Sequence, residues 1–178
     1  MSTQGLDEFR ARYGQLTVTA CEWRAMQADP HAVAEDVFVR LAKQRDAPTL
    51  SLLYTAIQAA VLQAYTNNAT SFLDKMRGQH EVLDNVPRDS QREAALRVAL
   101  SNLRTRDREL LQLALWDELT PSELAEVLRI EAATVPTRIA EALGHFATLA
   151  AKRGIPLDSL ELPEVLRALK PGTQTRAG

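Results

Sequence analysis

Cysteine, glycine and long apolar runs are scarce in this sequence. Of its 178 residues, one is cysteine (Cys21) and seven are glycine. A single cysteine excludes an internal disulfide and argues against a cysteine-based metal cluster. Because glycine is scarce while Ala, Leu, Glu and Arg are plentiful, the composition predicts an all-α fold. No apolar run could cross a membrane and no basic-then-apolar leader begins the chain, so we expect a cytoplasmic protein without a membrane partner.

The sequence also lacks the patterns that accompany catalysis. It contains no glycine-rich phosphate loop, no metal-ligand spacing among its three histidines and no nucleophile paired with a base. We therefore expect no enzymatic activity, no cofactor and no metal site. The formal net charge of −2 is unusual for a nucleic-acid binder, because Lys and Arg contacts with phosphate supply most nonspecific affinity. If the protein binds DNA, we expect a larger partner to supply most of the contact.

The hydrophobic pattern predicts two small helical domains joined by a flexible linker. We place the first helical domain at residues 1–78, the linker at 79–93, a helix-turn-helix domain at 94–153 and a C-terminal extension at 154–178. The linker is polar and poorly periodic and contains a proline. The extension is apolar enough over Leu157–Leu169 to form a short helix. That helix could cap the second domain, join the two domains or bind a partner.

Apolar residues recur at helical spacing along both domains. The pattern predicts helices over residues 6–24, 32–44, 49–67, 70–77, 93–103 and 106–116, followed by the two helices of the helix-turn-helix. We expect Trp23 and Trp116 to pack in a core or interface rather than to stack on bases.

The stretch from Thr120 onwards predicts the helix-turn-helix itself. Thr120 is a suitable N-cap, and Glu123, three residues later, completes a capping box. A tight turn at residues 129–131 leads to the second helix. Proline inside a helix costs roughly 3 kcal/mol, but this cost is avoided if Thr134 is the N-cap and Pro136 lies in the first turn. In such a motif the second helix enters the DNA major groove, and its N-terminal residues meet the base edges.

This domain resembles the promoter-reading region 4 of bacterial sigma factors of the extracytoplasmic-function subfamily. The residues that carry the resemblance are Leu103, Arg108-Glu109, Glu123-Leu124-Ala125, Thr134-Val135 and Arg138. LuxR-type regulators share part of this pattern, so the helix-turn-helix alone does not decide the family. The first domain is similar to region 2 of the same subfamily, in the order Asp29-Pro30, Ala34-Glu35-Asp36 and Val37-Phe38-Val39-Arg40-Leu41.

The resemblance implies core RNA polymerase and promoter DNA as partners, with an anti-sigma factor as a further one. Its implied polymerase contacts lie on the second helix and are Glu35, Asp36 and Arg40. Its implied DNA contacts are Thr134, Thr137 and Arg138 in the recognition helix, Arg106 and Arg108 ahead of it, and Tyr65, Asn67 and Asn68 in the first domain. The two arginines ahead of it could equally pair with neighbouring acids.

Basic residues are missing from one stretch where the family uses them. No Lys or Arg occurs between Arg45 and Lys75. In the family, the corresponding surface melts the −10 element and holds it. Binding of single-stranded DNA requires a basic groove, which this stretch does not supply. Two alternatives to a sigma factor therefore stay open. One is a sigma mimic or adaptor that binds an anti-sigma factor or polymerase without melting DNA. The other is a helix-turn-helix repressor or activator, which would bind duplex DNA alone with a steep salt dependence.

Overall fold

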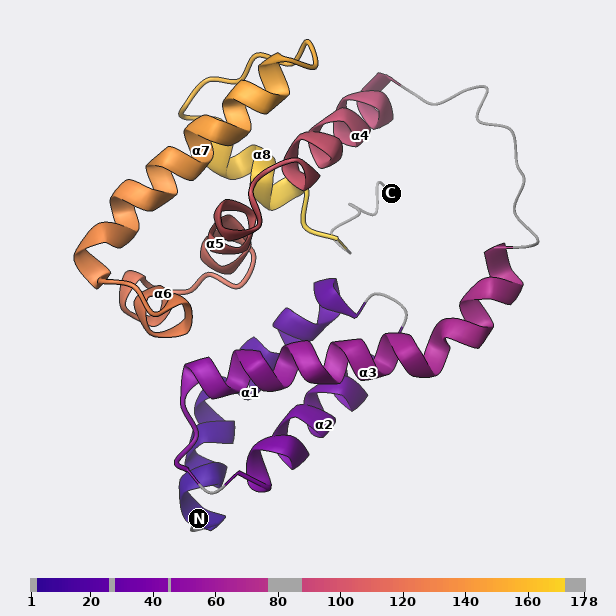
Figure 1. Cartoon of the computed structure of the whole chain (residues 1–178), viewed down its shortest axis with the longest axis vertical. Coiled ribbons are helices and arrows are strands. Elements are labelled where there is room, and N and C mark those ends of the chain that lie inside the picture. Colours follow the sequence, from indigo (N-terminus) through magenta and orange to yellow (C-terminus); the bar gives the residue numbers. More distant parts are fainter. Residues whose placement is uncertain (1–2, 26–27, 45, 77–87, 172–178) are drawn as a thin grey trace, which may run out of the picture. The chain divides into compact units, whose positions relative to one another are not determined.

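The computed structural model shows an all-α protein, which confirms the class predicted from composition (Figure 1). The structure describes residues 3–25, 28–44, 46–76 and 88–171, with the backbone alone described at 3–4, 67–76 and 88–89. Every regular element within these ranges is a helix. None of these helices combines the length and the hydrophobicity that crossing a membrane requires.

The described part of the first compact unit, Met1–Glu81, contains three helices. They are α1 (Thr3–Arg24), α2 (Pro30–Ala42) and α3 (Leu50–Met76). Helix α2 packs against both α1 and α3 (Figure 1). Its start is fixed by Asp29, whose carboxylate accepts a hydrogen bond from the His31 amide at 3.1 Å, and by Pro30 at the first helical position. The stripe that α2 buries is Val33, Ala34, Val37, Phe38 and Leu41.

Helix α3 is longer than the sequence pattern predicted. The separate helices expected at 49–67 and 70–77 form one continuous helix, Leu50–Met76. The residues between them, Asn-Asn-Ala-Thr at 67–70, lower helix propensity but include neither proline nor glycine. The apolar periodicity therefore weakens there while the backbone stays helical.

The second compact unit, Val82–Gly178, contains five α-helices and a short 3-10 turn in its described part. They are α4 (Arg88–Ser101), α5 (Thr105–Leu115), α6 (Pro121–Leu128), the turn Ala132–Thr134, α7 (Val135–Ala151) and α8 (Leu162–Ala168). Helix α7 packs against α4, α5 and α6 and supplies the centre of this core, since its Phe146 is completely buried.

The predicted linker at 79–93 is wrong at its C-terminal end. Helix α4 begins at Arg88, so residues 88–93 are helical. These residues, Arg-Asp-Ser-Gln-Arg-Glu, are exposed where the structure describes their side chains, and they therefore lack the apolar periodicity that marks a helix in sequence. The remaining residues of the predicted linker, 79–87, lie outside the described residues.

The C-terminal extension is part of the second unit, where α8 contacts α5 and α7. Its Leu162, Leu166 and Leu169 side chains are buried. The Trp116 indole nitrogen donates a hydrogen bond to the Leu166 carbonyl at 2.7 Å, and Lys170 Nζ donates one to the Trp116 carbonyl at 2.8 Å. Of the three roles left open for this segment, the structure therefore supports capping of the second domain. Trp116 is a core residue, as predicted.

We expect Leu166→Ala to lower the free energy of unfolding of the second unit by about 2–5 kcal/mol, because the side chain is 1% exposed and its loss leaves a cavity. The control is Leu160→Ala in the same segment, whose side chain is 92% exposed and whose loss should change stability by no more than about 0.5 kcal/mol. Urea unfolding of full-length protein carrying Trp23→Phe, followed by Trp116 fluorescence, measures both. Equal effects of the two substitutions would show that α8 is not part of the cooperative core.

Candidate nucleic-acid interface

The first helix of the predicted helix-turn-helix begins with the capping box that the sequence indicated. The Thr120 amide donates to Glu123 Oε2 at 2.9 Å, and Thr120 Oγ1 accepts from the Glu123 amide at 3.4 Å. Pro121 occupies the first turn, where its missing N–H would have no helical partner in any case. The start of α6 is therefore fixed by its own first four residues.

A non-glycine residue makes the turn that ends α6. Arg129 has φ 54° and ψ 49°, in the left-handed region, and its amide donates to the Ala125 carbonyl. Glycine usually fills this position because a side chain there is strained. The following 3-10 turn then directs the chain into α7, and the Thr134 hydroxyl donates to the Glu131 carbonyl at 2.7 Å within it. Backbone hydrogen bonds and one hydroxyl hydrogen bond thus determine how the chain turns from α6 into α7.

Thr134 immediately precedes α7, and Pro136 lies in its first turn, as the proline argument predicted. The capping is different from the prediction, because the Thr134 side chain makes no hydrogen bond to the amides of α7. It is half-buried and bonded back to Glu131. Thr134 therefore positions the start of α7 and does not cap its amides.

Thr137 and Arg138 are both exposed in the first turns of α7. Within the described part of the chain, neither side chain makes a hydrogen bond or an ion pair. The opposite face of α7 is buried and contains Val135, Ala142, Phe146 and Ala150. Since burial of that face fixes the rotation of the helix, Thr137 points away from the core and Arg138 lies at the exposed edge of the buried face.

The two arginines at the start of α5 have different environments. Arg106 is exposed, and no partner is found for it among the described residues. Arg108 is half-buried and its Nη1 donates to the Ser101 carbonyl at 2.8 Å, which joins the end of α4 to α5. Asp107 pairs with His145 Nδ1 at 2.9 Å and not with either arginine. Both arginines stay candidate phosphate contacts, but one nitrogen of the Arg108 guanidinium is already bonded to the Ser101 carbonyl.

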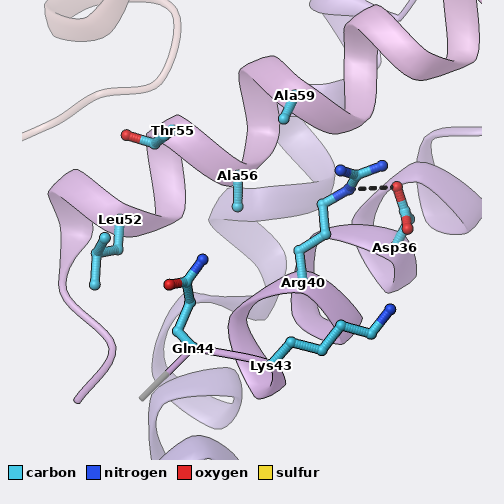
Figure 2. Close-up of a pocket in the computed structure, with 8 residues that line it drawn as sticks. All are labelled: Asp36, Arg40, Lys43, Gln44, Leu52, Thr55, Ala56 and Ala59. Atoms are coloured by element: carbon cyan, nitrogen blue, oxygen red, sulfur yellow. Dashed lines mark hydrogen bonds and ion pairs between the residues drawn. The ribbon is translucent and has the colours of Figure 1, made fainter. Parts of the chain in front are cut away.

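The implied polymerase contacts all lie on α2, but they do not form one cluster. Glu35 forms an ion pair with Arg10 of α1. Asp36 pairs instead with Arg40 at 2.8 Å, one turn further along α2 (Figure 2). This second pair lies at a groove of about 370 Å³ between α2 and α3. The groove is lined by Asp36, Arg40, Lys43, Gln44, Leu52, Thr55, Ala56 and Ala59.

The predicted DNA contacts of the first unit are only partly described. The Tyr65 hydroxyl donates to the Arg24 carbonyl at 2.8 Å, so it ties α3 to the end of α1. Asn67 and Asn68 lie in the helical backbone of α3, but their side chains are outside the described residues. The exposed face of α3 that precedes them carries no charge, and Leu62 on it is 69% exposed.

Some contacts at these surfaces could not be found in the sequence. The Asp107–His145 pair joins residues 38 positions apart, and the Tyr65 bond spans 41 positions. No local pattern signals such pairings. The Asp36–Arg40 pair, in contrast, has the i, i+4 spacing that favours ion pairs on helices and could have been predicted.

No protein-family model, curated protein or solved structure matches this chain.

Thr120→Ala should lower the stability of the second unit by about 1 kcal/mol, because it removes the two hydrogen bonds of the Thr120 hydroxyl, one accepted from the Glu123 amide and one donated to Glu123 Oε2. Ser122→Ala, two residues further on and also exposed, is the matched control and should change stability by no more than about 0.5 kcal/mol. Urea unfolding of the two variants provides the comparison. Equal stabilities would mean that the capping box does not stabilise α6.

Proposed function

We propose that this protein is a sigma factor of the extracytoplasmic-function type. It binds core RNA polymerase through its first unit and a −35-type promoter element through α7. Two things support the proposal. One is the order of the motifs along the chain, from Ala34-Glu35-Asp36 to Thr134-Val135. The other, which carries most of the argument, is the exposure of the unpaired Thr137 and Arg138 side chains at the start of the second helix of a helix-turn-helix.

Recognition of the promoter would begin with the first turns of α7. The recognition helix of such motifs lies in the major groove with its N-terminal residues against base edges. Arg138 can donate two hydrogen bonds to O6 and N7 of a guanine, and Thr137 can contact a thymine methyl or a phosphate. Arg106, exposed at the start of α5, can contact a phosphate and fix the register of the unit.

The polymerase would dock on α2 at the groove beside α3. The Asp36–Arg40 pair is partly exposed, at 42% and 33% of the two side chains, so solvent screens it and it contributes less than about 1 kcal/mol. A weak intramolecular pair of this kind can exchange its partners for charged groups of a docking protein. Glu35 is similarly placed, since its ion pair with Arg10 is exposed.

One observation favours a second candidate function, a sigma mimic or adaptor. The exposed face of α3 at Thr55, Gln58 and Leu62 is uncharged, and it offers no cation to a single DNA strand. A protein of this kind would bind polymerase or an anti-sigma factor without melting DNA. Gln63→Arg should then create promoter opening only where docking on polymerase is intact.

We expect full-length protein and core RNA polymerase to form a one-to-one complex in gel filtration at moderate salt. Transcription from genomic fragments by that complex then separates the two candidates, because a sigma factor initiates at specific sites and a mimic does not. Failure to form the complex would contradict the sigma factor and any mimic that acts on polymerase. Two alternatives would remain, an adaptor that binds an anti-sigma factor and a helix-turn-helix regulator, and a duplex-binding assay would test the second.

Arg138→Ala should weaken binding of the complex to a promoter that it transcribes by about tenfold, because one bidentate base contact is worth about 1–3 kcal/mol. Arg167→Ala on α8 removes the same charge from an exposed position and should leave binding nearly unchanged. Fluorescence anisotropy with a labelled duplex measures both. If the two variants lose affinity equally, general charge and not a contact from α7 accounts for the effect.

A further inference from the structure

The outward face of α7 carries an acidic residue directly beside the proposed DNA contacts. Glu141 is exposed and lies one helical turn after Thr137. At 3.6 residues per turn, Thr137, Arg138 and Glu141 fall within an arc of about 100° that does not include the buried Phe146. A helix that approached DNA with Thr137 and Arg138 would therefore bring Glu141 to the same surface.

Nothing in the fold accounts for this acid. Among the described residues, the Glu141 carboxylate makes no hydrogen bond and no ion pair. Arg138 is three positions before it, but the two side chains do not pair. Glu141 is the seventh residue of α7, beyond the first turn in which a negative charge interacts favourably with the helix dipole. Facing a phosphate, it would weaken binding, so its presence on a DNA-reading face needs a favourable contact.

Base edges in the major groove offer one such contact. A carboxylate accepts hydrogen bonds and donates none, so it is repelled by the O6 and N7 acceptors of guanine and by O4 of thymine. It matches an amino donor, which cytosine presents as N4 and adenine presents as N6 beside the N7 acceptor, so cytosine is the better partner. An arginine has the opposite preference and matches guanine. In the major groove, a C·G base pair therefore presents a donor for a glutamate, cytosine N4, beside two acceptors for an arginine, guanine O6 and N7.

The spacing of the two side chains suits a single base pair. Three residues of helix advance about 4.5 Å along the axis and turn the side-chain direction by about 60°, so Arg138 and Glu141 are neighbours on the helix surface. Long side chains from Arg138 and Glu141 can thus converge on one pair. Gly144 follows on the same face, and a Cβ there would meet nothing within 4 Å, so packing does not require glycine at this position. Its missing side chain leaves room for DNA beside Glu141.

We infer that Glu141 is a specificity-determining residue whose carboxylate accepts a hydrogen bond from cytosine N4, while Arg138 donates to the guanine of the same base pair. This inference rests on the proposed function, in which α7 reads duplex DNA. It assigns to the DNA site a C·G pair opposite the second turn of α7.

The test is selection from a randomised duplex DNA library by full-length protein in complex with core polymerase, with polymerase alone as background. The wild type, Glu141→Gln, Arg138→Ala and Glu164→Gln are compared. Glu164 is an exposed acid on α8, so its substitution makes the same charge change away from α7. Thermal unfolding of each variant verifies that the exposed substitutions leave the fold intact.

We expect the wild type and Glu164→Gln to enrich one motif that contains a C·G pair. In Glu141→Gln the preference for cytosine over adenine at that pair should fall about tenfold, because an amide both donates and accepts and so also matches adenine N6 and N7, while the other positions and the overall affinity are retained or increased. Arg138→Ala should reduce the preference for guanine at the same base pair. The assignment is overturned if Glu141→Gln binds more tightly yet keeps every base preference, because the acid then only repels phosphate. If the wild type enriches no motif, the proposed function fails, and the assignment fails with it.

Discussion

Burial of one face of α7 is the constraint on which the rest of the second unit depends. Phe146 and its neighbours Val135, Ala142 and Ala150 have almost no exposed surface. Rotating the helix would expose these side chains to water, which is unfavourable in proportion to the apolar area exposed. The outward positions are therefore fixed by packing on the inward face. Thr137, Arg138 and Glu141 owe their common direction to residues that cannot themselves contact DNA.

The chain from α6 into α7 is held by local hydrogen bonds and not by a large buried core. The capping box at Thr120 sets where α6 begins, and Arg129 in the left-handed region sets where it ends. The 3-10 turn with its Thr134 hydroxyl bond then fixes the start of α7. Each of these contributions is small compared with burial of a large side chain, but together they determine the helix-turn-helix geometry.

The sequence predicted best those features that depend on neighbouring residues. The starts of α2, α6 and α7 follow from Asp29-Pro30, Thr120-Pro121 and Thr134 with Pro136, and all were found near their predicted places. It failed where apolar periodicity is weak although the backbone is helical, as in the first turns of α4 and the middle of α3. It could not indicate that Arg108 bonds to Ser101, or that Tyr65 bonds to Arg24, because such pairings are set by tertiary packing.

The contacts of α8 also define the smallest piece of this chain that can present α7 in its observed form. Arg97 in α4 donates to the Leu169 carbonyl at 3.0 Å, so α4 is bonded to the residue that follows α8. A fragment that ended near Arg153 would leave the Trp116 indole N–H without its acceptor and would expose apolar surface on α5 and α7. Such a fragment would be prone to self-association. A fragment that keeps α7 in its observed form must therefore extend from α4 through Lys170.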